Sequence, residues 1–431
     1  MSSRKLPWYR KLAFISMTLT LVWGIIELIS LGGLHLCRGE FTFAGLREEQ
    51  RILAKGARLV SSGEEVIHPY LGWIKNPDLA EPEQINGREI RVNALGFRDD
   101  GETIYQRNRR EFLLGIAGGS VASNMSWDAE DLILELLSGH PAIQGRSIRI
   151  IRMATPGYKQ PQQLQLLTYL LALGGEFDAV INLDGFNEAT LAVQENAKNE
   201  TAIAYPRGWH TRTITMFDPK DSKDAFALLE IKATRQRMAQ TILQPPWCWS
   251  PACNLFWLFR EQQNIERLTD LGVRLFSQQR TGFGNHGPLE TFTSEEDMAD
   301  KAAELWFRSS LQMQRLCAAN GIIYLHALQP DQYVQGSKPL TEAELREAYA
   351  EDAGTLSVVR LTYPRLMQLG RMLTEEGVAF SDQTMVFKEV NETLYIDPWC
   401  HVNKRGSEIL ATSVLKDLMH LLEVERGKTS E

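Results

Sequence analysis

The sequence lacks several features that would place it in a specialised class of protein. It has no long basic run, and its formal net charge of −8 with a pI of about 5.7 gives it no electrostatic reason to bind nucleic acid. It has no repeat at solenoid or propeller periods and no low-complexity segment, which excludes those architectures and a disordered chain. With 431 residues, 44% of them hydrophobic, the chain is long enough for one large core or two smaller ones.

Cysteine is scarce, and its spacing excludes the common zinc modules. The chain has five: Cys37, Cys248, Cys253, Cys317 and Cys400. Their spacing matches no zinc ribbon or finger, and Cys400 with His401 and the distant His326 forms no metal-binding pattern. We therefore expect no metal site at these residues. Cys248 and Cys253 are either free thiols or a small disulfide loop, and the disulfide would require an oxidising compartment.

One long apolar run lies close to the N-terminus. Residues 12–36 are long enough to cross a hydrocarbon layer of about 30 Å. The residues before this run include four basic ones, Arg4, Lys5, Arg10 and Lys11. By the positive-inside rule, the N-terminus is expected in the cytoplasm and the rest of the chain outside it. Glu27 is the only acidic residue in the run, and we expect it to be protonated or to face a polar partner, since a carboxylate in hydrocarbon is costly.

The alternative interpretation of this run is a cleaved signal peptide. The run is longer than a usual signal core and no small-x-small cleavage site ends it, which favours an uncleaved anchor. Cys37 follows Leu36 where a lipoprotein needs a small residue. We therefore expect a cytoplasmic N-terminus and transmembrane anchor at 1–37, a polar stalk at 38–64 and a folded domain at 65–431. A single span is a tether and does not suggest a channel or transporter.

Strand-like and helix-like segments alternate through the folded domain. Short apolar, β-branched runs predict strands at 111–119, 147–154, 177–185 and 322–330. Helical spacing with start and stop signals predicts helices at 128–138, 161–175, 294–321, 356–376 and 403–424. This alternation predicts an α/β fold in which a mainly parallel sheet is covered on both faces. Ligands of such sheets bind at the carboxyl ends of the strands.

A tryptophan-rich segment at 199–293 interrupts this alternation and reads as an insertion, helical over 222–243. It contains Trp209, Trp247, Trp249 and Trp257 and a cluster of prolines. One interpretation is that these rings are platforms for a sugar or an acyl chain next to the site. The other, which is the more common role of such residues, is that they pack the insertion onto the rest of the protein.

Polar residues suited to acyl transfer follow the predicted strands. Ser120 ends the first strand at a glycine-rich turn, where its hydroxyl can project over the sheet edge. A serine hydroxyl needs an adjacent base to act as a nucleophile, and His401 has the proton affinity for that role near neutral pH. Asp397 is the candidate for holding the tautomer of His401 and stabilising its imidazolium. The sequence therefore predicts a Ser–His–Asp site.

The tetrahedral intermediate of acyl transfer carries an oxyanion, which needs hydrogen-bond donors. The candidates are the backbone N–H groups of Ser120 and Gly157 and the side-chain amide of Asn187, each of which follows a different predicted strand. Since the carboxyl ends of parallel strands meet at one edge of a sheet, we expect these groups to lie close together.

Four blocks of sequence, GGSVAS, ATPGYK, DGFNEA and DPWCHVNKRG, occur in this order and carry these residues. Together with the upstream VNALGFRDD, they resemble the SGNH (GDSL-like) hydrolase superfamily, in particular its membrane-anchored bacterial members. The resemblance covers roughly residues 65–425. It implies a flavodoxin-like, three-layer α/β/α fold and ester hydrolysis by a serine nucleophile without a metal or other cofactor.

The chain departs from the family pattern at two places. Gly119 stands where the family usually has aspartate, which does not affect the role of Ser120. Asp397 lies four residues before His401 rather than three, and the residue at the usual spacing is Pro398, which cannot serve. Either the loop bulges by one residue so that Asp397 still reaches His401, or a backbone carbonyl orients the imidazole.

The same residues are compatible with other functions. Asp184 and Glu188 read as residues flanking an asparagine turn rather than as a glycosidase pair. An O-acyltransferase would use the same Ser–His site, and an inactive binding or assembly module would share the fold. A glycan on the sequon at Asn124 would obstruct the site, which favours a bacterial envelope or periplasm. We expect an ester substrate there, such as an acylated carbohydrate, while protein partners and oligomeric state stay open.

Overall fold

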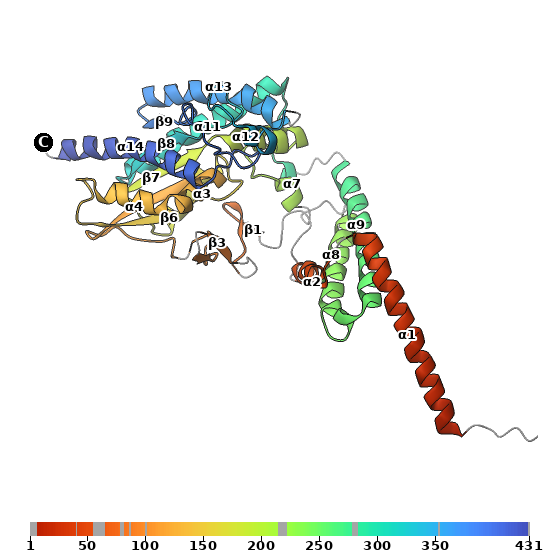
Figure 1. The fold of residues 1–431 in the computed structure, drawn as a ribbon. Helices are drawn as coiled ribbons and strands as arrows, with labels where there is room; N and C mark the ends of the chain where they lie inside the picture. The colour runs from red at the N-terminus through yellow and green to blue at the C-terminus, as the bar shows by residue number, and fades with distance from the viewer. Residues whose placement is uncertain are drawn as a thin grey trace, which may run out of the picture. The chain divides into compact units, whose positions relative to one another are not determined.

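The computed structural model (Figure 1) describes residues 7–39, 41–54, 65–77, 82–85, 88–99, 101–213, 222–277, 283–351 and 354–429. These residues form two compact units. The anchor unit contains the described residues of 1–63 and 214–280, and the sheet unit contains those of 64–213 and 281–431. Of the predicted insertion, the described residues of 214–280 therefore belong to the anchor unit, while its flanks belong to the sheet unit.

The sheet unit is built on five parallel strands in the order β6-β5-β7-β8-β9. Their bounds are β5 Glu111–Gly118, β6 Ser147–Arg152, β7 Ala179–Asp184, β8 Ile323–Leu328 and β9 Phe380–Asp382. Numbered within the sheet, this order is 2-1-3-4-5, so the chain changes direction across the sheet between β5 and β7. In open α/β sheets, ligands bind where the strand order reverses, which points to the ends of these two strands. The predicted mixed α/β class with a parallel sheet is confirmed.

Helices connect the strands, as the alternation in sequence predicts. The longer ones are α3 Ser120–Asp128, α4 Glu130–Ser138, α5 Gln162–Ala172, α11 Glu295–Ala319, α13 Gly354–Glu375 and α14 Lys404–Thr429. The short ones are α6 Phe186–Thr190, a π-turn at Leu191–Asn196, a 3-10 turn at Ala197–Asn199, α7 Trp209–Arg212, α10 Phe283–His286 and α12 Glu342–Glu347. Two antiparallel pairs, β1 Glu65–His68 with β2 Gly72–Lys75 and β3 Glu83–Ile85 with β4 Arg88–Ile90, precede the sheet. The start of α11 is capped by Ser294, whose hydroxyl accepts the Asp297 N–H, as the sequence suggests.

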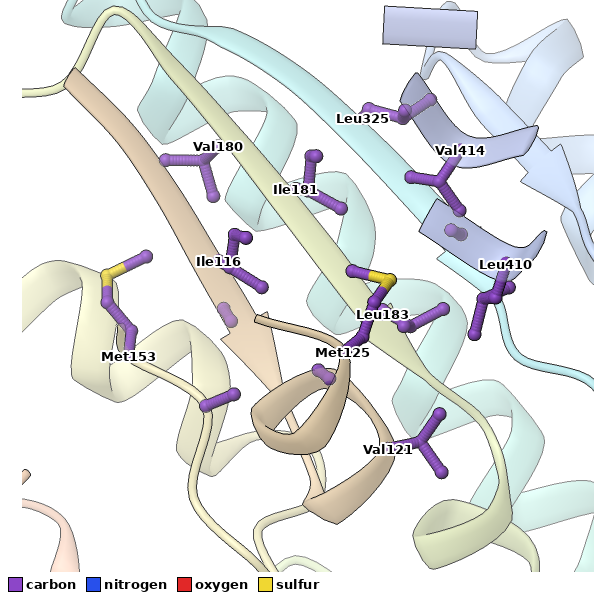
Figure 2. Packing of buried hydrophobic residues seen from close by; sticks show 14 of the residues in the cluster. Ile116, Val121, Met125, Met153, Val180, Ile181, Leu183, Leu325, Leu410 and Val414 are labelled. Atoms are coloured by element: carbon purple, nitrogen blue, oxygen red, sulfur yellow. The ribbon is translucent and has the colours of Figure 1, made fainter. Parts of the chain in front are cut away.

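The core lies between the sheet and the helices that cover it. Every residue of β7, and of β5 after its first, is buried, as expected for strands without a solvated face. Figure 2 shows strand residues of this core together with side chains from α3 and α14, among them Ile116, Ile181, Leu183, Leu325, Val121, Met125, Leu410 and Val414. This packing fixes where β5 ends and α3 begins.

The anchor unit consists of helices α1 Trp8–Arg38, α2 Phe43–Ala54, α8 Ser222–Ile242 and α9 Pro251–Ser277, with a 3-10 turn at Trp247–Trp249. Helix α1 is long and apolar enough to cross a membrane by length and composition. Helices α8 and α9 pack together as a hairpin, α2 packs on α8, and α1 packs on α9. Leu46, Ile242 and Trp257 form one buried cluster of this unit, and Leu228, Leu268 and Leu271 form another.

The structure shows the state of the cysteines and the burial of the tryptophans in the insertion. All five cysteines are free thiols, so Cys248 and Cys253 form no disulfide loop. Trp257 is buried within the anchor unit, whereas Trp247 and Trp249 are 49% and 64% exposed. The exposed pair lies at the tip of the α8–α9 hairpin, at the connection between the two helices.

Candidate active site

Ser120 is the first residue of α3, directly after the end of β5. The preceding Gly118 has φ of +142°, and a Cβ atom there would lie 2.0 Å from the carbonyl oxygen of Leu183 on β7. No other residue fits such a position, because a side chain would overlap the backbone of the neighbouring strand. The glycine therefore permits the tight strand-to-helix turn that presents Ser120 at the edge of the sheet.

Ser120, His401 and Asp397 are joined by two hydrogen bonds, although Ser120 lies 281 residues from His401 in sequence. The Nε2 atom of His401 is 2.7 Å from the Ser120 Oγ, and its Nδ1 atom is 2.6 Å from the Asp397 Oδ2. Side chains of His401 and Asp397 keep 25% and 32% of their surface exposed, so solvent reaches this group. The arrangement has the geometry in which a base withdraws a proton from a nucleophilic hydroxyl.

The four-residue spacing between Asp397 and His401 is accommodated by a bulge. Cys400 takes a left-handed backbone conformation with φ of +64°, which is uncommon for a residue other than glycine. The loop is closed by a hydrogen bond from the Ile396 N–H to the His401 carbonyl oxygen, 3.0 Å long. Of the two alternatives for orienting the imidazole, the structure has the one in which the loop bulges and the Asp397 carboxylate reaches the ring.

The Asp397 carboxylate also shapes the loop that carries it. Its Oδ1 atom accepts the backbone N–H groups of Trp399, at 2.8 Å, and His401, at 3.4 Å. Partial burial alone would raise the pKa of Asp397, but the hydrogen bond and charge of His401, with these two N–H groups, outweigh it and lower the pKa below its ordinary value. The carboxylate is therefore ionised at neutral pH, as stabilisation of an imidazolium requires.

Two residues after β8 hold this loop in place, and sequence reasoning missed both. The Gln332 Nε2 atom donates to the Asp397 carbonyl oxygen at 3.0 Å, and the Tyr333 hydroxyl donates to the Pro398 carbonyl oxygen at 3.2 Å. Both lie about 65 residues before the loop, in a segment with no recognisable motif. Only the tertiary structure shows that they position the Asp397–His401 pair.

A buried ion pair supports the start of the same loop. Glu344 and Lys338 have fully buried side chains, and their charged groups are 2.8 Å apart. The other carboxylate oxygen of Glu344 accepts the N–H groups of Leu394, at 2.8 Å, and Tyr395, at 3.0 Å. Burial by itself raises the pKa of Glu344, but the hydrogen bonds from Lys338 and these N–H groups lower it below its ordinary value. The ionised Glu344 thereby fixes the strand-like segment just before Asp397.

Gly157 lies in a tight turn after β6. The Tyr158 N–H donates to the Thr155 carbonyl oxygen at 3.0 Å, and Gly157 has φ of +86°. A proline at the second position and a glycine with positive φ at the third are the signature of a type II turn, and Pro156-Gly157 supplies both. Within the described ranges, neither the Gly157 nor the Ser120 N–H has a backbone acceptor, which leaves both able to donate to an oxyanion.

Asn187 lies between this turn and the start of α3 at Ser120. Its Nδ2 atom donates to the Tyr158 carbonyl oxygen at 2.7 Å, which leaves the second amide hydrogen for another acceptor. The same Nδ2 atom would be 2.4 Å from a Cβ atom built on Gly119, the residue before Ser120. The three predicted oxyanion donors therefore come from neighbouring turns, and glycine at position 119 leaves room for the Asn187 amide.

This packing predicts the effect of a side chain at position 119. In Gly119→Ala, the new methyl group displaces the Asn187 amide, and we expect kcat to fall about as far as in Asn187→Ala, on the order of 10²-fold, with the fold intact. The measurement is ester hydrolysis beside circular dichroism of the same samples. Gly139→Ala, at a site where a Cβ meets nothing closer than 3.7 Å, is the matched control. A Gly119→Ala or Asn187→Ala protein with the native rate would contradict the role of Asn187.

Glu188 connects the turns after β6 and β7. One oxygen of its buried carboxylate accepts the Gln160 N–H at 2.8 Å, and the other accepts the Gly185 N–H at 2.9 Å. Burial, with a smaller effect of the nearby Asp184 charge, raises the pKa of Glu188 to about 8. Sequence reasoning assigned Glu188 only a flanking place beside Asn187. Its position shows that it holds the Asn187 turn and the Gly157 turn together.

A second Ser–His–Asp chain occurs in the core. The Ser310 Oγ is 2.7 Å from the His326 Nδ1, and the His326 Nε2 is 2.9 Å from Asp184, which also accepts the Trp306 indole N–H at 2.7 Å. Ser310 and His326 have no exposed surface, and Asp184 and Glu188 have 2% each. No substrate reaches these groups, so the chain is a satisfied polar network. The same burial argues against a glycosidase pair formed by Asp184 and Glu188.

The sequence matches no family model and no curated protein sequence. In the part of the chain that the structure describes, no cluster of three His, Cys, Asp or Glu side chains has the geometry of a metal site.

Proposed function

We propose that this protein is a membrane-tethered serine esterase with an SGNH-type, three-layer α/β/α fold, acting through an acyl-enzyme on an ester of the bacterial envelope. The observation that carries the proposal is the continuous hydrogen-bonded chain from Ser120 through His401 to Asp397. It is supported by the strand order 2-1-3-4-5 and by the position of Ser120 and Asn187 at the ends of β5 and β7, beside the point where that order reverses.

In this proposal, His401 accepts the Ser120 hydroxyl proton through Nε2 while Oγ attacks the ester carbonyl carbon. The oxyanion that forms is stabilised by the N–H groups of Ser120 and Gly157 and the amide of Asn187, and Asp397 stabilises the imidazolium. His401 then protonates the departing alcohol, which leaves an acyl group on Ser120. Water, activated by the same histidine, releases the acid; a sugar hydroxyl in its place would make the protein an O-acyltransferase.

A carbohydrate substrate is favoured by a pocket in the sheet unit. The pocket has a volume of about 230 Å³ and is lined by the rings of Tyr70, Tyr205 and Trp209 and the amide of Gln162. Aromatic faces and side-chain amides are suited to the apolar faces and hydroxyl groups of a sugar. The pocket also includes Pro206, next to Arg207, and the Arg207 side chain lies 3.1 Å from a Cβ built on Gly157. Arg207 therefore connects the segment that lines this pocket to the Gly157 turn.

The proposal predicts an acyl-enzyme that can be observed directly. When the full chain is mixed with a short-chain aryl ester such as p-nitrophenyl acetate, we expect a burst of p-nitrophenol and an acetyl group on the peptide containing Ser120, identified by mass spectrometry. Addition of an oligosaccharide then separates the activities: transfer of acetyl to the sugar indicates a transferase, and unchanged release of acetate indicates an esterase. A folded protein that forms no acyl adduct would favour the non-catalytic binding module.

The membrane topology is part of the same proposal, with α1 as the anchor, the N-terminus in the cytoplasm and the sheet unit outside. The four basic residues before the apolar run support this orientation. Alkaline phosphatase fused after Thr429 is expected to be active, since that enzyme matures only outside the cytoplasm, and an inactive fusion of normal abundance would overturn the assigned localisation.

A further inference from the structure

Only the C-terminal part of α1 is covered by the rest of the anchor unit. Residues 8–23 are exposed throughout, and burial begins at Gly24. From there, Gly24, Glu27, Ser30, Leu31 and Leu34 are half or fully buried, at the spacing of three and four residues that marks one helix face. Figure 1 shows the N-terminal part of α1 running on past α8 and α9. The covered face therefore starts well inside the apolar run.

The side chain that begins this contact is Glu27, the one acidic residue of the run. Its Oε1 atom accepts the Ser250 hydroxyl at 2.6 Å, and its Oε2 atom accepts the Ala252 N–H at 2.9 Å. These donors lie at the N-terminus of α9, a helix of 27 residues whose dipole favours a negative charge at that end. Further along, a Cβ on Gly33 would lie 2.9 Å from Leu255, so α9 starts at the level of Glu27 and runs in the same direction as α1.

The length of α1 decides at what depth this contact lies. If the hairpin tip were in water, the membrane would have to be crossed by residues 12–23 alone, which as a helix span about 18 Å against about 30 Å of hydrocarbon. A span of about 20 residues starting at Leu12 ends near Leu31, which places Glu27 about 6 Å inside the outer boundary. The start of α9 therefore lies at the depth of the outer leaflet.

The surface of the hairpin tip suits that depth. Trp247, Trp249, Phe256 and Phe259 are 49 to 64% exposed, although each is large and apolar. Beside them is a pocket of about 550 Å³, lined mainly by apolar side chains that include Met238, Ile242 and Trp257. Arg237, also in its lining, is five residues before the end of α8, about 7 Å back from the tip. A cation at that height faces the lipid headgroups.

We propose that the tip of the α8–α9 hairpin, residues 243–259, is a second membrane-embedded element, which lies in the outer leaflet beside α1 and holds the acyl chain of a phospholipid in its pocket. Glu27 satisfies the polar groups at the start of α9, Arg237 binds the lipid phosphate, and the exposed aromatic side chains contact neighbouring lipids. This inference rests on the proposed membrane anchoring by α1 but not on the esterase activity.

The test uses the full chain reconstituted in phosphatidylcholine vesicles that contain acyl-brominated lipid, which quenches nearby tryptophan. We expect the quenched part of the emission to fall clearly in W247F/W249F. In that background, F256W is expected to restore quenching, whereas V273W is not, because position 273 is equally exposed but about 33 Å along α9 from its start. Equal quenching of F256W and V273W, or no change in W247F/W249F, would overturn the inference.

Two further measurements separate the causes of failure. Trp23 lies in α1, so quenching of its emission reports on α1 alone. If the quenched emission falls in W23F while the tryptophans of the hairpin tip are not quenched, α1 is in the membrane and only the embedded hairpin is rejected. A diazirine-bearing phosphatidylcholine is expected to crosslink to the peptide containing residues 238–257. Crosslinks between two copies of the chain at this peptide, without lipid adducts, would instead assign the pocket to a partner helix.

Substitution of Glu27 tests the polar contact itself. In E27L, the Ser250 hydroxyl and the Ala252 N–H lose their acceptor, and hydrogen exchange at Ala252 is expected to rise by about tenfold or more. E27Q keeps a carbonyl oxygen and is the matched control, with a smaller rise. Exchange that is the same in E27L and the native chain would show that Glu27 does not hold the start of α9.

Discussion

Ser120→Ala is expected to abolish covalent labelling by a fluorophosphonate probe and to lower kcat for an aryl ester by about 10⁶-fold, the loss typical for a nucleophile that acts as one unit with its base. The probe reacts only with a serine whose hydroxyl is activated, and in this protein the Ser120 Oγ is 2.7 Å from the His401 Nε2. The measurement is labelling of the full chain followed by mass spectrometry of the modified peptide. His401→Ala is expected to lose a similar factor, since the hydroxyl then has no base.

The chain contains its own control for this experiment. Ser310 also lies 2.7 Å from a histidine that contacts an aspartate, but it is completely buried. We therefore expect no label on Ser310, and Ser310→Ala should keep both the labelling of Ser120 and the rate, at some cost in stability. Ser138→Ala, at the exposed end of α4, controls for the substitution itself. Labelling that persists in Ser120→Ala would contradict the proposed nucleophile.

Asp397→Asn is expected to lower kcat by about 10⁴-fold while leaving the fold and the position of the loop unchanged. The asparagine carbonyl can still accept the Trp399 and His401 N–H groups that the Oδ1 atom accepts, so the bulge is kept. The amide nitrogen, however, replaces the Oδ2 atom opposite the His401 Nδ1, and two donors then face each other. The imidazole must turn its proton toward Ser120, where it cannot act as a base.

The kinetic parameters of Asp397→Asn distinguish the loss of the catalytic base from a loss of the folded structure. We expect KM to change little while kcat falls, together with unchanged thermal unfolding. Asp131→Asn, on the exposed face of α4, is the matched control. If Asp397→Asn retained the native rate, the aspartate would have only a structural role in the loop, and the Gln332 and Tyr333 contacts would be sufficient to orient His401.

The predicted strands and helices follow from local sequence patterns, and their bounds in the structure are close to the predicted ones. The run at 111–119 becomes β5 and the periodic segment at 294–321 becomes α11, with ends shifted by one or two residues. Strand β9 was not predicted because its three residues are too short to show a period. The part of the insertion that belongs to the anchor unit, 214–280, is shorter than the predicted insertion, 199–293. Amino-acid composition does not show which flanking residues pack on the sheet unit.

The sequence predicts those residues of the site that lie at the ends of strands. Ser120, Gly157 and Asn187 follow β5, β6 and β7, and parallel strands bring such ends together. The spacing of Asp397 and His401 left two geometries open, and the structure decides between them through the bulge at Cys400 and the contact of the Asp397 carboxylate with the His401 ring. The roles of Glu188 and Glu344 depend on contacts between segments far apart in sequence, for which the sequence carries no local signal.

The sequence by itself determined the class of fold, the apolar run at the N-terminus and the residues able to carry acyl transfer, because each depends on residue type and on short-range periodicity. Tertiary structure alone decided that one Ser–His–Asp chain, Ser120–His401–Asp397, is open to solvent while the other, Ser310–His326–Asp184, is sealed in the core. It also decided that Glu27 faces a polar partner, the Ser250 hydroxyl and the Ala252 N–H. Burial and partner choice arise only when distant segments pack together, and local sequence cannot specify them.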